Sequence, residues 1–255
     1  MDLKKFKILK MKDVSDSFVT KKEQIFNLPM RLLIIGKSGD GKSGYLGNLL
    51  LRKEFYRDDF LPENIFIFSG SVKGGGDKKL QTIIDEIEIP ETNIFSGYDE
   101  DNLEGVYDHL VDEFNDNVED GVKDKKKLNS IVILDDLAFN DSFKDKGKND
   151  MVRKLYMNGR KFSISTLILS QKVTSVSTAI RENITGMILG KSSNKQLETV
   201  ANDHNYLKGK NSTKRFIDMV KTATEKPFSK FIINFSQPEL YQDTDFEPIK
   251  LEEPK

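Results

Sequence analysis

The sequence predicts an α/β protein in which a mostly parallel central sheet is flanked by helices. Short apolar runs alternate along the chain with segments of helical periodicity, and a glycine-rich loop joins the first such pair. One later run, 131–134 (IVIL), is apolar at every position, which is typical of a strand covered on both faces of a parallel sheet. At 255 residues the chain is long enough for one domain with a sizeable core.

Each expected element follows from a local pattern. Apolar runs predict strands at 31–35, 64–68, 93–95, 130–134, 164–169, 186–189 and 231–235. Apolar residues at helical spacing predict helices at 44–52, 77–87, 101–114 and 150–157, and Asn158-Gly159 is a stop signal for the last. The polar segment 115–128 is typical of a surface loop, and residues 6–11 are a candidate edge strand.

These patterns divide the chain into three parts. Residues 1–26 form a mixed lead-in, 27–236 form the α/β domain, and 237–255 form an acidic tail that contains prolines. Because the tail has little apolar surface to bury, we expect it to be extended or disordered.

Composition excludes several classes of protein. The 40 Lys and Arg residues balance 41 Asp and Glu residues, so any contact with DNA must be local rather than global. The chain has no cysteine, which excludes disulfides and thiolate metal sites and suits a reducing compartment. No apolar run approaches the ~18 residues of a membrane span, and the N-terminus lacks a signal-peptide core. We therefore expect an intracellular, soluble protein.

The segment 36–43 (GKSGDGKS) fits the phosphate-binding pattern G-x-x-x-x-G-K-[ST] without a mismatch. It follows a predicted strand and precedes a predicted helix, as a loop that presents backbone N–H groups to phosphate requires. The residues expected to bind the nucleotide are Gly36, Lys37, Ser38, Gly39, Asp40, Gly41, Lys42 and Ser43. Lys42 would contact the β- and γ-phosphates, and the Ser43 hydroxyl would bind Mg²⁺. The pattern thus predicts ATP and Mg²⁺ as ligands.

Two aspartates follow the apolar run 131–134, in the manner of a Walker B strand. Asp135 would hold the magnesium ion, directly or through water. Asp136 occupies the position at which many such ATPases carry a glutamate that polarises the attacking water. Alone, the pattern also fits a solvated acidic turn, but the upstream phosphate loop favours the catalytic interpretation.

Gln171 closes the segment 167–171, in which a buried strand ends in a polar amide, and it would sense the γ-phosphate or orient water, although a glutamine that caps the strand end is the alternative. Charge that develops on the transferred phosphoryl group calls for an arginine. The candidates are Arg153, Arg160 and Arg181, of which Arg160 is favoured, acting within its own subunit or on a neighbour. A surface cation at a helix end is the alternative for Arg160.

In this order, the segments resemble the genome-packaging ATPases of large double-stranded DNA viruses and virophages, within the FtsK–HerA superfamily. The segments that carry the resemblance are 33–43, 131–136, 158–171, 180–183 and 186–189, within about residues 26–200. The phosphate loop and Walker B strand are common to P-loop enzymes. The specific part is Arg160, Lys161 and Ser165 ahead of Gln171, with a lysine where a histidine is common, together with Arg181-Glu-Asn183.

The resemblance implies a P-loop NTPase core of the RecA/FtsK–HerA type over residues 27–236. It also implies a homo-oligomeric ring, a pentamer or hexamer, that uses ATP hydrolysis to thread double-stranded DNA without sequence specificity into a preformed capsid. Capsid vertex or portal proteins would be partners. The implied location is the viral assembly site in the host cell, with the virion as a second location. The basic segments 73–79, 123–127 and 144–148 are candidate DNA contacts, and solvated loops are the alternative.

Other functions stay open at this point. Asp136 is shorter than the glutamate usual in the superfamily, so another acid or Gln171 is an alternative for positioning the water. A hydrolytically weak ATP-binding scaffold is therefore the main alternative. A P-loop NTPase with a non-DNA substrate is another, but 194–197 (NKQL) lacks the aspartate of a guanine motif, and the few arginines do not form a kinase lid. No nuclease constellation follows the ATPase core.

Overall fold

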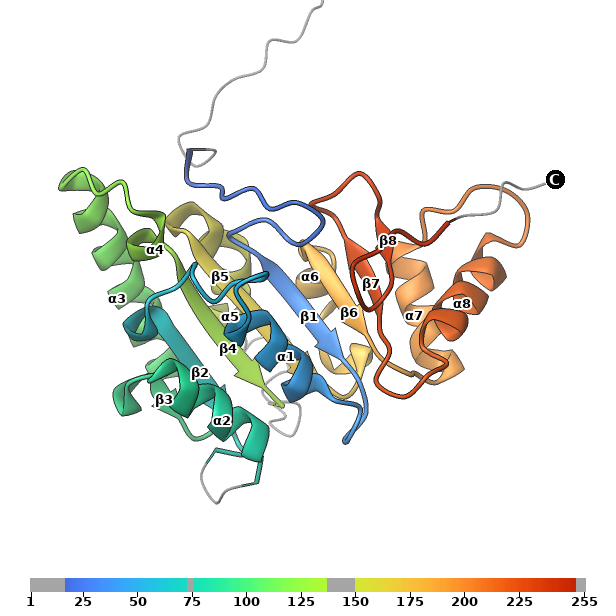
Figure 1. Cartoon of the computed structure of the whole chain (residues 1–255), viewed down its shortest axis with the longest axis horizontal. Helices are drawn as coiled ribbons and strands as arrows, with labels where there is room; N and C mark the ends of the chain where they lie inside the picture. Colours follow the sequence, from blue (N-terminus) through green and yellow to red (C-terminus); the bar gives the residue numbers. More distant parts are fainter. Residues whose placement is uncertain (1–16, 73–75, 137–149, 251–255) are drawn as a thin grey trace, which may run out of the picture.

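The computed structural model describes residues 17–72, 76–136 and 150–250. In these ranges one eight-stranded sheet has the order β3-β2-β4-β5-β1-β6-β7-β8 (Figure 1). Neighbouring strands from β3 to β6 are parallel, whereas the β6–β7 and β7–β8 pairs are antiparallel. The predicted α/β class with a mostly parallel sheet is confirmed.

The strands lie close to their predicted positions. They are β1 (Arg31–Ile35), β2 (Ile65–Ser69), β3 (Ile94–Phe95), β4 (Ser130–Asp135), β5 (Ile164–Ser170), β6 (Gly186–Leu189), β7 (Phe231–Asn234) and β8 (Tyr241–Gln242). The helices are α1 (Lys42–Leu51), α2 (Lys78–Ile87), α3 (Glu100–Glu119), α4 (Lys125–Leu128), α5 (Asp150–Asn158), α6 (Thr178–Arg181), α7 (Asn194–His204) and α8 (Ser212–Ala223). None of these helices is long and apolar enough to cross a membrane.

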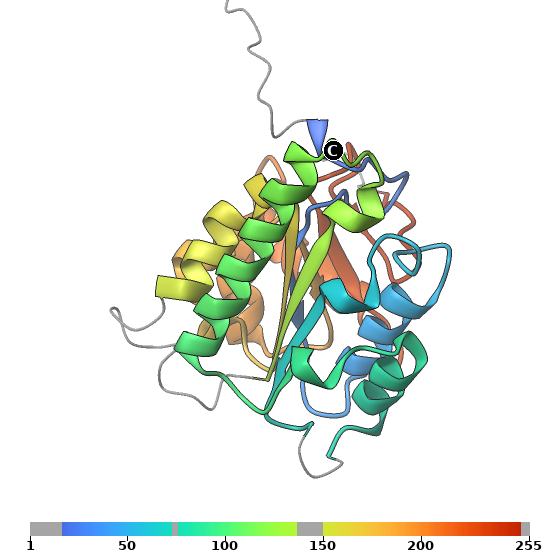
Figure 2. The same cartoon turned by 90° about the vertical axis from the view of Figure 1, so that its left-hand side faces the viewer.

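The sheet separates two apolar clusters because successive side chains of a strand point to opposite faces. Leu33 and Ile35 of β1 pack with α3, α5, α7 and α8 on one face, and Leu32 and Ile34 pack with α1 and α2 on the other. Figure 2 shows the sheet edge-on between these two layers of helices. Covering on both faces explains why the central strands are apolar throughout.

The strand order determines where the functional segments meet. Strand β5 lies between β1 and β4, with Ile35 opposite Ser170 and Asp135 opposite Leu169. All three strands run in the same direction, so their carboxyl ends share one edge of the sheet. The residues that follow β1, β4 and β5 are therefore neighbours in space.

Two expectations need correction. The segment 115–128 is not a loop throughout: α3 continues to Glu119, and α4 covers 125–128. The helix continues because no glycine or proline lies between Val106 and Asp120, and it ends just before Gly121, which adopts a positive φ of 70°. The sheet also extends further than the strand pattern indicates, because β8 pairs with β7 and the nearby Phe246 is buried.

The division at residues 26 and 236 stays a prediction, although part of the predicted tail packs on the domain through β8. The segments 6–11 and 144–148, and part of 73–79, lie outside the described residues. Of the basic segments, 123–127 contains the start of α4, where Lys125 donates a hydrogen bond to the Val19 carbonyl at 3.0 Å.

Candidate nucleotide-binding site

A cavity of about 550 Å³ opens at the carboxyl edge of the sheet. It brings together most of the phosphate loop and all three polar residues predicted at the ends of β4 and β5. The cavity is lined by Ser38, Gly39, Gly41, Lys42, Ser43, Gly44, Ser71, Gly76, Asp77, Lys78, Lys79, Asp135, Asp136 and Gln171. Every one of these lining residues is polar or glycine, and together they supply acids, amines and hydroxyls.

The phosphate loop connects β1 to α1 through two left-handed glycines. Gly39 has a φ of 79° and Gly41, the N-cap of α1, a φ of 84°, and side chains are strained in this region. The Lys42 ammonium donates hydrogen bonds to the carbonyls of Gly36 (3.0 Å) and Lys37 (3.4 Å). The ammonium thus lies against its own loop, and the N-terminus of α1 adds to the positive potential there.

Asp135 ends β4 and is only 5% exposed. Its carboxylate accepts hydrogen bonds from the hydroxyls of Ser69 (2.8 Å) and Ser71 (3.4 Å), at the carboxyl end of neighbouring β2. Burial raises the pKa of this carboxyl, and the nearby Asp136 and Asp77 charges add to that shift, whereas the Ser69 hydrogen bond and the Lys42 charge oppose it without reversing it. The site therefore holds a poorly compensated negative charge that a cation would stabilise.

Asp136 and Gln171 are brought into direct contact. The Gln171 amide donates a 2.8 Å hydrogen bond to one carboxylate oxygen of Asp136, and the other oxygen is buried without a hydrogen-bond partner. Asp136 has a positive φ of 48°, and its N–H donates to the carbonyl of Leu169. This turn aims the carboxylate toward β5, and the unpartnered oxygen is an acceptor for one further proton donor.

Asp77 is a site residue that sequence reasoning missed. Its carboxylate accepts hydrogen bonds from the backbone N–H groups of Lys79 and Leu80, as the N-cap of α2, and a close one from the Ser43 hydroxyl. An aspartate before a helical pattern signals a cap. Its contact with Ser43 joins residues 34 positions apart and has no local signature.

The oxygen ligands at this edge fit Mg²⁺. The Ser43 hydroxyl and the Asp135 carboxylate line the same cavity, and both are hard donors of the kind that Mg²⁺ prefers. Nowhere in the described ranges do three His, Cys, Asp or Glu side chains form a cluster that could hold a metal ion. A Mg²⁺ ion held by one or two protein oxygens, with phosphate and water completing its shell, suits this arrangement.

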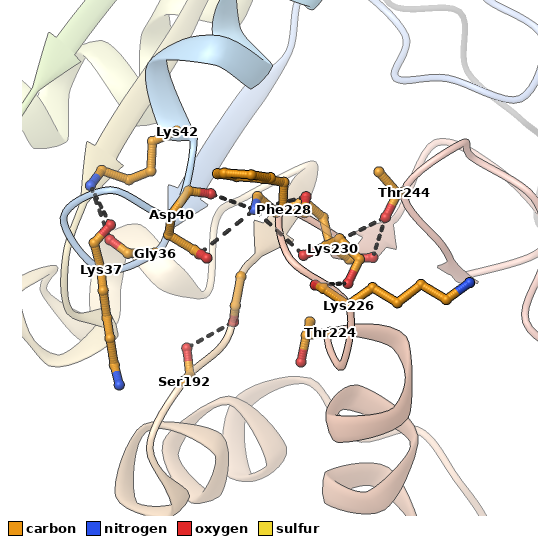
Figure 3. A network of polar contacts seen from close by, with 12 residues as sticks. Gly36, Lys37, Asp40, Lys42, Ser192, Thr224, Lys226, Phe228, Lys230 and Thr244 are labelled. Atoms are coloured by element: carbon orange, nitrogen blue, oxygen red, sulfur yellow. Dashed lines mark hydrogen bonds and ion pairs between the residues drawn. The ribbon is translucent and has the colours of Figure 1, made fainter. Parts of the chain in front are cut away.

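Asp40 is part of the phosphate loop but does not line the cavity. Its carboxylate lies 3.6 Å from the ammonium of Lys230, whose side chain is 1% exposed and precedes β7 (Figure 3). The same ammonium donates to the Asp40 carbonyl at 2.7 Å. A Cβ at Gly190 would lie 1.7 Å from the Asp40 carboxylate, so a side chain there would displace that carboxylate from its place near Lys230. The loop is therefore fastened to the β6–β7 side of the sheet.

The candidate arginines lie elsewhere. Arg160 is exposed just before β5, at the amino edge of the sheet. Arg31 lies near it: the burial of Arg31, and after that the charge of Arg160, lower the pKa of Arg31. This edge is about 17 Å from the phosphate loop, the length of a five-residue strand. Arg181 is buried and binds Asp203 at 2.7 Å. Arg153 is exposed in the first turn of α5, which runs back from the carboxyl edge.

A family model described as Poxvirus A32 protein matches residues 17–246. The chain belongs to this family. No curated protein sequence matches the chain.

Solved structures similar to this A32-family chain share its fold. The genome packaging NTPase B204 from Sulfolobus turreted icosahedral virus 2, in complex with AMPPCP, has a TM-score of 0.53 at 14% identity, over 86% of this chain and 98% of that one. B204, the DNA-packaging ATPase from Sulfolobus Turreted Icosahedral Virus, has a TM-score of 0.52 at 15% identity, over 88% and 99%. EssC (ATPases 2 and 3) from Geobacillus thermodenitrificans has a TM-score of 0.50 at 14% identity, over 77% and 44%.

These findings confirm the P-loop NTPase fold and the resemblance to viral packaging ATPases. The roles assigned to individual residues of this A32-family chain stay predictions, and the buried charge of Asp135 offers a direct test of one of them.

We expect Asp135→Asn to raise the free energy of unfolding at neutral pH in the absence of Mg²⁺. Because the pKa of Asp135 is raised in the folded state, the folded protein holds this proton more tightly than the unfolded chain does. The stability that protonated Asp135 contributes is therefore lost as the pH rises from the pKa of Asp135 in the unfolded chain through its pKa in the folded protein. Asparagine still accepts the Ser69 hydrogen bond but carries no charge. Urea unfolding at several pH values should show a gap between variant and wild type that shrinks toward acidic pH.

Proposed function

We propose that this chain is an ATP-hydrolysing motor that translocates double-stranded viral DNA into a preformed capsid. The observation that carries the proposal is one cavity shared by the phosphate loop, Asp135 and the hydrogen-bonded pair of Asp136 and Gln171. A site that only bound nucleotide would need the loop but not a carboxylate with a free buried oxygen beside the γ-phosphate position. Membership of the A32 family and the likeness to packaging NTPases supply the context.

Each predicted residue has a role in this proposal. The loop amides and Lys42 bind the phosphates, and Ser43 and Asp135 hold Mg²⁺, which neutralises charge on the transferred phosphoryl group. Asp136 accepts a proton from the attacking water, and Gln171 orients that carboxylate or the water itself. Ser43 exchanges its hydrogen bond with Asp77 for the metal.

The position of Arg160 supports an oligomeric arrangement. It lies at the edge opposite the cavity, so a finger role in its own subunit would require it to cross the sheet; a role on a neighbouring subunit and a surface cation at a helix end are the two interpretations left. Arg153, nearer the carboxyl edge, is the second candidate. We propose a homo-oligomeric ring, a pentamer or hexamer, that docks on capsid vertex or portal proteins at the viral assembly site. Basic residues at each subunit would add around the ring to hold DNA phosphates.

We expect ATP hydrolysis by the full chain with Mg²⁺ to rise several-fold when duplex DNA of arbitrary sequence is added. Translocation along a duplex couples DNA engagement to turnover, and phosphate contacts are independent of sequence. Steady-state phosphate release with and without duplex, repeated at increasing salt, measures this coupling. Single-stranded DNA of equal nucleotide content is the control.

Two results would contradict the motor. ATP binding without turnover under any condition would favour an assembly scaffold, and turnover indifferent to duplex DNA would favour an NTPase with another substrate.

A further inference from the structure

Phe228 is the most exposed large hydrophobic side chain among the described residues, at 64%. It also has a positive φ of 64°, a conformation that is rare for a bulky residue and that clusters at functional sites. Neither feature helps to build the core. A conformation that costs energy while presenting an aromatic ring to solvent indicates that the ring has something to bind.

The ring of Phe228 lies against the phosphate loop. A Cβ at Gly41 would come within 3.1 Å of its Cδ1 atom, so the two residues are in contact. Gly41 also lines the cavity described above, so the Phe228 ring lies beside a residue of the cavity wall without lining the cavity itself. The glycine at this position leaves one face of the loop open to the ring.

Lys230 holds Phe228 in place. Its buried ammonium donates hydrogen bonds to the carbonyl of Phe228 (3.1 Å) and to the carbonyl of Asp40 (2.7 Å). One charge thus ties the Phe228 backbone to the phosphate loop, as Figure 3 shows. The preceding turn is closed by hydrogen bonds from the N–H and hydroxyl of Ser229 to the carbonyl of Lys226. The aromatic ring is therefore attached to a rigid support.

Phe228 lies on the side of the loop opposite Asp136 and Gln171. These two residues follow β4 and β5, on one side of β1, whereas Phe228 precedes β7, beyond β6 on the other side. A triphosphate whose γ end faces Asp136 directs its nucleoside end away from β5. Phe228 is an exposed aromatic ring on that nucleoside side.

We propose that Phe228, whose backbone Lys230 holds against the phosphate loop, is the platform on which the base of the bound nucleoside triphosphate stacks. The inference rests on the proposed ATP site. Stacking on one ring accepts every base, because each has a π face, and purines offer the larger face. The ring therefore contributes affinity for nucleosides with little discrimination between them.

The test separates binding of the base from binding of the phosphates. Isothermal titration calorimetry compares Mg²⁺-ATP with Mg²⁺-tripolyphosphate, which has the phosphates but no base. We expect Phe228→Ala to weaken ATP binding by about 5- to 100-fold and to leave tripolyphosphate binding unchanged. Tyr206→Ala is the matched control, because Tyr206 is also exposed (59%) but follows α7, which runs away from the carboxyl edge.

A second variant reports on the contact between the base and the ring by fluorescence. The chain contains no tryptophan, so Phe228→Trp places a single indole at the platform. Its fluorescence should be quenched by ATP and remain unchanged with tripolyphosphate, because only the base stacks on the ring. Circular dichroism and thermal unfolding establish that both variants fold.

The outcomes distinguish a failure of the Phe228 platform from a failure of the proposed ATP site. If the wild type binds ATP and Phe228→Ala binds it equally well, the platform is wrong while the ATP site stands. The same holds if tripolyphosphate quenches the indole as ATP does. If the wild type binds neither ligand, the proposed ATP site fails and the platform fails with it.

Discussion

Replacement of Lys42 by alanine is expected to abolish ATP hydrolysis, with a loss of at least about 10²- to 10³-fold in turnover. Among the described residues, the Lys42 ammonium donates its hydrogen bonds to the carbonyls of Gly36 and Lys37. It can leave both to neutralise the β- and γ-phosphates without uncovering a buried charge. Alanine removes that charge where the transition state accumulates negative charge, and Mg²⁺ alone does not replace it. Phosphate release at saturating ATP measures the loss.

Lys37→Ala is the matched control for this prediction. Lys37 belongs to the same loop and carries the same charge, but its side chain is exposed and it occupies a variable position of the motif. We expect near-normal turnover from this variant, and an unchanged unfolding midpoint from Lys42→Ala. Wild-type turnover in Lys42→Ala would show that hydrolysis occurs at another site or in a contaminant.

Asp136→Asn is expected to lower hydrolysis by about 10²- to 10⁴-fold while ATP binding is retained. The free oxygen of Asp136 is buried beside the cavity and is the acceptor that we assign to the attacking water. Asparagine keeps the size of the side chain and tolerates the positive φ of this turn, but it cannot take a proton. Single-turnover hydrolysis alongside calorimetric ATP binding separates the chemical step from affinity.

A double variant tests whether Gln171 acts through Asp136. The two side chains share a 2.8 Å hydrogen bond, so Asp136→Asn combined with Gln171→Ala should be little worse than Asp136→Asn alone. Asp136→Glu keeps the carboxylate on a side chain that is one methylene longer, and this variant should keep substantial activity. If Asp136→Asn kept full activity while Gln171→Ala lost it, Gln171 rather than Asp136 would be the residue that positions the water.

Much of the fold could be predicted because its signals are local. The apolar run 131–134 and the glycine loop at 36–43 each specify a backbone conformation from adjacent residues. The end of α3 could not be placed from apolar spacing, since the only apolar side chain of its last turn, Val118, is exposed and the helix stops before Gly121. Strand β8 is only two residues long, and pairing with β7 rather than its own composition makes it a strand.

The candidate site divides in the same way. Asp135, Asp136 and Gln171 could be placed at one edge because each ends a strand and parallel strands end together. Arg160 also follows from a sequence motif, but its place at the opposite edge depends on which end of β5 it adjoins. Asp77 and Lys230 act on the phosphate loop from separate segments, and no spacing in the sequence indicates either contact.

The sequence alone was enough to predict a nucleotide ligand and the residues expected at its γ-phosphate, because phosphate loops and the carboxylates at strand ends depend on contiguous residues and on strand direction. The tertiary structure alone decided how the loop is supported and what lies at its other end. Lys230 is 190 residues from Asp40, and its buried ammonium brings Phe228 to Gly41. Such contacts arise from the packing of β7 beside β6, which is a property of the whole sheet rather than of any one segment.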